Sequence, residues 1–238
     1  MRSGFPGFPP AGIQFFRSLA RHNNRDWFQP RKHLFEEQVK QPMRELVEAV
    51  NAAMKSFAPD YVTDPEKAIY RIYRDTRFSH DKTPYKDHIA ASFRRRGGGR
   101  HEGAGYYFAV SHKEVAVGGG IYMPTPEVAR AVRNHVAARH QELRKIAKSP
   151  TVRRLLGEIQ GHQLTRVPKG FPADHAAADL LRFKQYVLYV ELAPDIATTS
   201  ALFREIVQRF KAITPFVEFL NAPLTPARKR IDLSELIL

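Results

Sequence analysis

The sequence predicts an α+β fold in one domain, with a small, mainly antiparallel sheet flanked by N-terminal, central and C-terminal helices. Segments with the apolar spacing of helices come first and last, whereas strand-like segments cluster between residues 68 and 123, with one more at 182–192. Regular alternation of strands and helices, which would indicate a parallel sheet, is missing. The 238 residues suit a domain over 12–223, between a flexible segment 1–11 and a tail 224–238.

The first part of the domain is expected to be helical. Residues 12–21 have the pattern of a short amphipathic helix, which ends before the turn-forming pair Asn23 and Asn24. Apolar residues then recur at threes and fours over 34–50, which predicts a second helical region. Within that region Pro42 predicts a kink or a new first turn.

The sheet is expected to begin at residue 68, where β-branched and aromatic residues alternate with arginine up to residue 74. The competing interpretation is a helix capped by Asp64 with Pro65 at its first position. Further along, 88–93 is a second predicted strand and 94–103 a basic, glycine-rich loop. Residues 105–111 and 114–123 are predicted to form a hairpin across His112 and Lys113.

The second half begins with a helix signal. Thr125 is a good N-cap, Pro126 suits the first helical position, and the helix is expected to continue to Lys148. The later segments are predicted to be a loop at 164–175, a final strand at 182–192 and an amphipathic helix over 200–223.

Charge is the most informative feature of the composition. The formal net charge is +14, and residues 71–100 and 130–154 supply almost all of it. Clustered positive charge attracts polyanions, so the first partner to expect is an anionic ligand, possibly nucleic acid. The chain has no cysteine and no apolar run long enough for a membrane helix, which leads us to expect a cytoplasmic protein without a membrane partner.

Five blocks of the sequence resemble a known family. They are NNRDWF (23–28), RIYRDTRFSHDKTPYK (71–86), GYYFAV followed by GGGIYMPTPEV (105–128), KGFPADH (169–175) and PFVEFLNAP (215–223). In this order they are similar to domain of unknown function 2461, a widespread, chiefly bacterial family of uncharacterised proteins. The resemblance implies one full-length domain, and it implies no activity, cofactor or catalytic set.

Block 71–86 is the candidate site. Its five cations, together with the arginines that follow the next predicted strand, make an anion-binding set of Arg71, Arg74, Arg77, Lys82, Lys86, Arg94, Arg95 and Arg96. The interspersed aromatics that could stack on bases are Tyr73, Phe78 and Tyr85. The structural alternative is an ion-paired loop that ties the predicted strand to the helices, in which Asp75 and Asp81 neutralise two of the five cations and leave about three for a ligand.

The same block also allows a catalytic interpretation. Asp75, His80 and Asp81 are the groups that acid and base chemistry on an anionic or phosphoester substrate would use. No HExxH or GxSxG pattern is present, and the glycines at 118–120 lack the lysine and hydroxyl residue of a phosphate-binding loop. We therefore expect no metal and no cofactor, and three function classes stay open: anion binding, a hydrolase-like enzyme, and a structural or protein-interaction domain.

Overall fold

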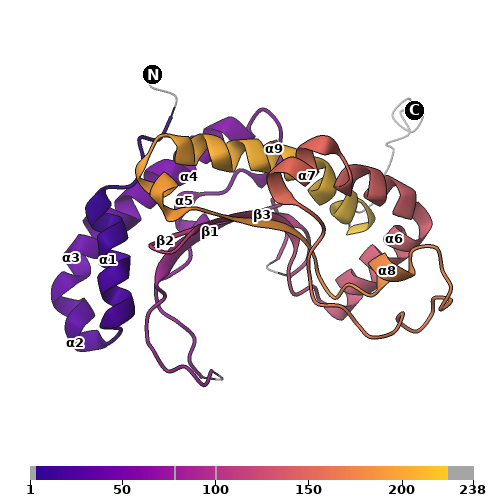
Figure 1. Cartoon of the computed structure of the whole chain (residues 1–238), viewed down its shortest axis with the longest axis horizontal. Helices are drawn as coiled ribbons and strands as arrows, with labels where there is room; N and C mark the ends of the chain where they lie inside the picture. The colour runs from indigo at the N-terminus through magenta and orange to yellow at the C-terminus, as the bar shows by residue number, and fades with distance from the viewer. Residues whose placement is uncertain (1–3, 78, 100, 225–238) are drawn as a thin grey trace, which may run out of the picture.

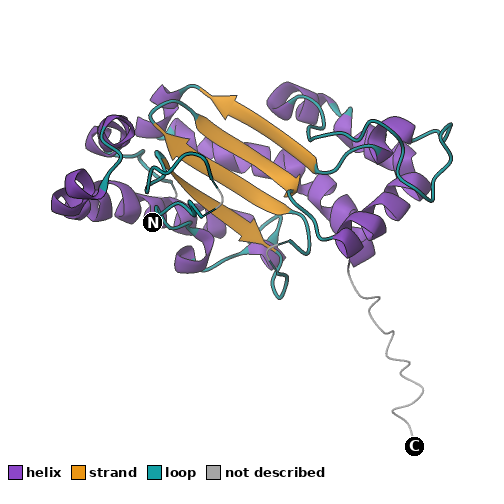
Figure 2. Cartoon of the chain, turned by 90° about the horizontal axis from the view of Figure 1, so that it is seen from below, coloured by secondary structure: helices purple, strands orange, loops and turns teal. Residues whose placement is uncertain are grey.

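A four-stranded antiparallel sheet in the order β1-β2-β3-β4 forms the middle of the molecule, and helices lie against one of its faces and at both of its ends (Figures 1 and 2). The computed structural model describes residues 4–77, 79–99 and 101–224. The strands are β1 (His88–Arg94), β2 (Gly105–Ser111), β3 (Val115–Ile121) and β4 (Tyr186–Leu192), each antiparallel to the next. The predicted α+β class is confirmed.

The α-helices are α1 (Pro10–Arg21), α2 (Arg25–Phe28), α3 (Lys32–Phe35), α4 (Gln41–Met54), α5 (Pro65–Ala68), α6 (Pro126–Ala147), α7 (Pro150–Leu156), α8 (Ala178–Leu181) and α9 (Ala201–Asn221). A π-helical turn, Glu36–Lys40, joins α3 to α4, and Pro42 sits in the first turn of α4, as one of the two sequence alternatives predicted. No helix in this described part of the chain is both long and apolar enough to cross a membrane.

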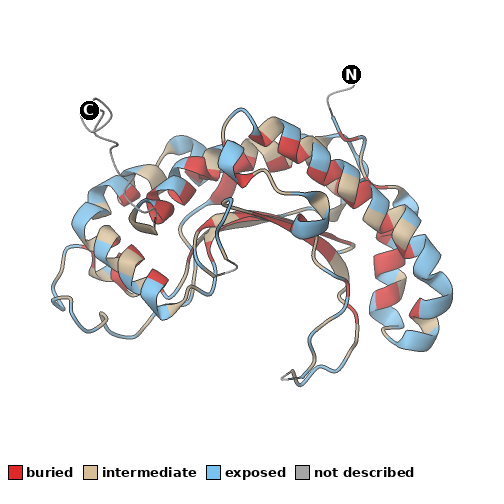
Figure 3. Ribbon diagram, turned by 180° about the vertical axis from the view of Figure 1, so that it is seen from behind, coloured by how far each residue is buried: buried red, intermediate tan, exposed pale blue. Residues whose placement is uncertain are grey.

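The main core lies between the sheet and α9. Buried residues follow the surfaces of α4 and α9 that face the sheet (Figure 3). The Phe210 ring of α9 contacts the rings of Phe93, Tyr106 and Phe108, which point to this side from β1 and β2. A side chain at Gly119 would place its Cβ 2.7 Å from Ile213 Cγ2, so a glycine lets α9 approach β3 closely.

The N-terminal segment differs from the prediction. We expected residues 1–11 to be flexible, yet Phe5 and Phe8 are buried and the Phe8 N–H donates to the carbonyl oxygen of Ala197 at 2.8 Å. Burying two phenylalanine rings offsets the entropy lost in ordering this short segment. The domain thus includes residues before position 12.

The predicted strand at 68–74 is wrong. Asp64 accepts a hydrogen bond from the Glu66 N–H at 3.0 Å, and with Pro65 at the first position it starts the short helix α5. Beyond Ala68 the chain is extended but makes only isolated bridges, Ile69 with Ala91 and Tyr73 with Tyr85. It leaves the edge of β1 after one bridge, so no ladder forms.

The other elements are close to their predicted positions. β2 has the predicted bounds, β3 is its hairpin partner, and Thr125 caps α6 by accepting from the Val128 N–H at 3.3 Å. β4 begins at Tyr186, four residues later than expected. The short helices α7 and α8 fall in segments for which we predicted no helix. The predicted tail lies outside the described residues from position 225 onward.

Candidate functional site

The described residues of block 71–86 form an irregular hairpin that projects from the edge of β1, on the side of the sheet opposite α9 (Figure 1). The two arms are joined near the base by hydrogen bonds from the Arg74 N–H to Pro84 O at 2.9 Å and from the Lys86 N–H to Ile72 O at 2.8 Å. The most distinctive sequence block is therefore one structural unit.

The base of this hairpin is anchored to the first helices. Tyr85 is 1% exposed, and its ring stacks on Phe28 with 4.1 Å between centroids. The side chain of Asn23 donates to Tyr85 O at 2.9 Å and accepts from the Tyr85 N–H at 3.0 Å. Tyr85 thus packs in the core. Of the other candidates for base stacking, Tyr73 is 44% exposed and Phe78 lies outside the described residues.

Two ion pairs join charges within the hairpin. Arg77 holds Asp75 in a two-point contact, Nε to Oδ1 at 3.0 Å and Nη2 to Oδ2 at 2.8 Å. The other carboxylate, Asp81, accepts from the Thr83 N–H at 2.9 Å and from Arg74 Nη1. Hydrogen bonds from Arg77 lower the pKa of Asp75 to about 2. Hydrogen bonds from the Thr83 N–H, and next from the Arg74 side chain, lower the pKa of Asp81 to about 2. Both pairs are exposed to solvent rather than buried.

The remaining hairpin cations have different surroundings. Lys82 Nζ donates to Thr76 O at 2.9 Å, and Lys86 Nζ donates to Arg71 O at 2.7 Å and lies 5.4 Å from the centroid of the Tyr70 ring. Within the described residues, no carboxylate forms a salt bridge with Arg71 or Lys82, and both side chains are exposed. Arg71 and Lys82 are therefore exposed cations that belong to neither ion pair.

The arginines at 94–96 do not join the hairpin cations. Arg94 is the last residue of β1, so it lies about 20 Å from the hairpin base at the other end of the strand. The Arg96 N–H donates to Asp60 O at 2.8 Å, which fixes the start of the loop, and the Arg96 side chain is exposed. The predicted anion-binding set therefore divides into two groups, one at each end of β1.

The candidate catalytic residues do not form a recognisable acid–base pair. Asp75 and Asp81 are each bound to a different arginine and are ionised at neutral pH, while His80 is exposed near the hairpin tip. Across the residues that the structure describes, no group of three histidine, aspartate or glutamate side chains could hold a metal ion. Charged side chains on an exposed hairpin suit binding better than catalysis.

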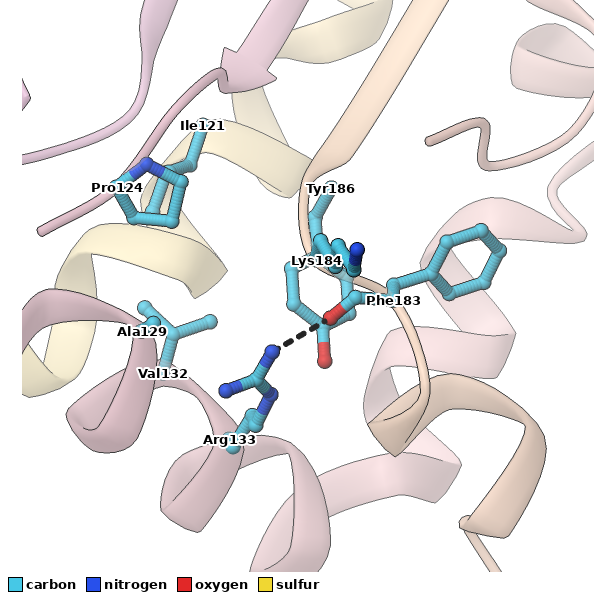
Figure 4. Close-up of a pocket in the computed structure, with 8 residues that line it drawn as sticks. All are labelled: Ile121, Pro124, Ala129, Val132, Arg133, Phe183, Lys184 and Tyr186. Carbon is cyan, nitrogen blue, oxygen red and sulfur yellow. Dashed lines mark hydrogen bonds between the residues drawn. The ribbon is translucent and has the colours of Figure 1, made fainter. Parts of the chain in front are cut away.

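Two hollows lie away from the hairpin. The first, between β3, α6 and β4, is filled by its own side chains, and Arg133 Nη2 donates across it to Phe183 O at 3.2 Å (Figure 4). The second is an open hollow of about 450 Å³ beside α7 and the outer edge of β4, where it is lined by Gln160, Tyr189 and Glu191 among others. Neither is lined by a residue of the predicted site.

The sheet face opposite α9 carries residues that the sequence prediction missed. Its floor is Ala90, Ala109 and Ala116, a cluster separate from the main core, against which Tyr70, Tyr107 and Tyr189 pack. We call these six residues the tyrosine face. Alternation in the predicted strands places Tyr107 and Tyr189 opposite the core positions, so the signal was present. The sequence did not show that, among the described residues, helices cover only the other face of the sheet.

Comparisons with known proteins give one match. A family model described as "Conserved hypothetical protein (DUF2461)" matches residues 11–219, which is most of the chain. No curated protein and no solved structure matches.

Proposed function

The chain belongs to DUF2461, a family of conserved hypothetical proteins, and we propose that it binds a phosphate-bearing polyanion, in the first place nucleic acid, through the hairpin 71–86. The observation that carries the proposal is the surroundings of Arg71 and Lys82. They are exposed on a projecting hairpin, and no carboxylate of the described residues forms a salt bridge with them.

The charge of the whole chain supports the same ligand class. A formal charge of +14 steers anions toward the protein, and each phosphate that a lysine or arginine neutralises releases counterions. The exposed Arg96 and half-buried Arg94, about 20 Å from the hairpin base along β1, offer a second contact to a ligand long enough to span that distance. A polyanion with a repeating phosphate backbone meets this requirement better than a small anion.

The two ion pairs give the hairpin its shape within this proposal. Arg74 and Arg77 are occupied by Asp81 and Asp75, so their main contribution is to fix the loop that presents Lys82. A purely structural hairpin would have the same ion pairs. That interpretation gives no role to the exposed cations outside the pairs, Arg71 and Lys82. Binding measurements separate the two interpretations.

The test uses fluorescence anisotropy with labelled single-stranded and duplex DNA at low salt. The double variant Arg71→Ala/Lys82→Ala should weaken binding by about tenfold or more, because it removes two phosphate contacts. The matched control is Lys55→Ala/Arg204→Ala, which removes the same charge from exposed positions on the helical side of the molecule. Equal loss in both double variants would show general charge attraction only, and undetectable binding by the unaltered protein would refute the proposal.

A further inference from the structure

The tyrosine face is covered by tyrosine side chains rather than by a helix. Figure 2 shows helices behind the sheet and at its two ends, with the near face crossed only by loop segments. The floor alanines are nevertheless buried, because tyrosine side chains and not a helix lie against them. Aromatic rings therefore form the outer layer on this side of the protein.

The strand register places these residues in rows. One row across the sheet is Ala90, Ala109, Ala116 and Glu191, and the next is Ser92, Tyr107, Gly118 and Tyr189. A Cβ at Gly118 would lie 3.1 Å from Cδ2 of the Tyr189 ring, so this ring rests directly over the glycine. Because the residues beneath the tyrosines are small, the rings can pack close to the backbone of the sheet.

Further aromatic side chains extend the face. The Tyr70 and Tyr107 rings are 6.4 Å apart at 59°, and Lys86 Nζ lies over Tyr70. Tyr122 directly follows Ile121, the last residue of β3, and is 66% exposed. Burial, more than any neighbouring group, raises the pKa of Tyr107 to about 12. Like any neutral tyrosine hydroxyl, that of Tyr107 can donate a hydrogen bond.

Charge is distributed unevenly across the face. Lys86 stands at the β1 side, where it belongs to the proposed phosphate-binding hairpin, and Glu191 stands at the β4 side, 3.3 Å from the Tyr189 hydroxyl. A ligand with phosphates toward β1 and hydrogen-bond donors toward β4 complements this arrangement. Single-stranded nucleic acid has both, since its bases carry N–H donors and are free to leave the backbone side.

Ser92 adds a second observation. It is 8% exposed, belongs to the row of Tyr107, and its hydroxyl has no hydrogen-bond partner among the described residues. A buried polar group without a partner raises the free energy of the fold. A base edge that reaches it after a shift of the tyrosine layer would supply the missing hydrogen bond.

We propose that the tyrosine face stacks the bases of single-stranded nucleic acid whose phosphates are held by the hairpin 71–86. The inference rests on the proposed function, because it assigns the bases of the same ligand. Aromatic residues on an open antiparallel sheet bind unstacked bases with little sequence preference, and duplex DNA, whose bases cover one another, lacks the exposed base faces.

The experiment compares three labelled probes of about 12 nucleotides: oligothymidylate, duplex DNA, and an abasic oligonucleotide of the same phosphate count. The protein should bind oligothymidylate about tenfold or more tighter than the abasic probe. Tyr107→Leu and Tyr122→Ala should each reduce this preference several-fold, while Tyr107→Phe, which keeps the ring, should retain it. Tyr122 is exposed and outside the alanine cluster, so its variant tests stacking even if Tyr107→Leu fails to fold.

The two proposals fail in different ways. Equal binding of oligothymidylate and the abasic probe, unchanged in the tyrosine variants, would overturn the stacking surface and leave the phosphate-binding hairpin intact. Tighter binding of the duplex would likewise overturn it. Weaker binding of all three probes by Arg71→Ala/Lys82→Ala, with base preference altered only in the tyrosine variants, is the expected outcome. No binding of any probe by the unaltered protein would overturn both.

Discussion

At the residue scale, one asparagine fixes how the hairpin sits on the helices. Asn23 and Tyr85 are 62 positions apart in sequence, yet the Asn23 amide pairs with both backbone polar groups of Tyr85. Stacking of Tyr85 on Phe28 adds ring contact at the same point. This local pairing sets the direction in which Arg71 and Lys82 are presented.

We predict that Asn23→Ala lowers the free energy of unfolding by about 1–3 kcal/mol, because it leaves two partly buried backbone groups without partners. Asn23→Asp keeps the acceptor for the Tyr85 N–H and should cost less. Urea denaturation followed by circular dichroism measures both. Unfolding curves that coincide with that of the unaltered protein would contradict the assigned role.

The two hairpin carboxylates predict a dependence of stability on pH. Their folded pKa of about 2 lies below the ordinary value of 3.8, so their contribution is present above about pH 4 and is lost as pH falls toward 2. Both groups are exposed, so the effect should be small. Acid titration of unfolding should be shallower in Asp75→Asn/Asp81→Asn than in the unaltered protein, and parallel titrations would exclude a stabilising role for these ion pairs.

At the element scale, β3 depends on its run of glycines. Gly119 admits α9, Gly118 lies beneath Tyr189, and Gly120 has φ +129°, a conformation that residues with a side chain rarely adopt. The sequence predicted a strand here. Which neighbour approaches each glycine was decided by the packing of α9 on one face and the tyrosines on the other.

Gly120→Ala should destabilise the protein by on the order of 1–3 kcal/mol or more, because the strained φ is combined with a Cβ 2.1 Å from Tyr186 O. Gly4→Ala is the matched control, since its Cβ would meet nothing within 4 Å. Thermal unfolding of the two variants side by side measures the difference. A similar midpoint for both would mean that β3 can relax around an added methyl group.

At the scale of the whole molecule, the two faces of the sheet have different roles in the structure. Helices α4 and α9 cover one side of the sheet, and the hairpin and the tyrosine face lie on the other (Figures 1 and 2).

Nucleic acid that is bound by about three phosphates on the side of the hairpin should lose roughly 20-fold in affinity between about 50 and 200 mM salt. A salt titration of oligothymidylate binding measures this slope. A flat dependence would contradict binding through phosphates.

The hairpin also offers a deletion test for the whole chain. The hydrogen bonds described for residues 74–83 join them to one another and to Pro84, so replacing this segment by a short glycine-containing turn should leave the fold intact. Polyanion binding should fall because Lys82 is removed and Arg71 loses its position. A large drop in the melting temperature would instead show that the hairpin is a structural support of the domain.

The sequence by itself determined the α+β class, the β2–β3 hairpin and the start of α6 at its cap Thr125, because alternation, helical spacing and capping act over a few residues. It also located the basic block. Only the tertiary structure decided which cations Asp75 and Asp81 neutralise, that Tyr85 is buried on Phe28, and that Arg94 lies a strand length away from Arg71. The tyrosine face likewise exists because the described helices that cover the sheet pack on its other side. The burial of Tyr85 and the tyrosine face depend on contacts between residues far apart in the chain, which no local pattern encodes, whereas the ion pairs of Asp75 and Asp81 depend on how the hairpin itself folds.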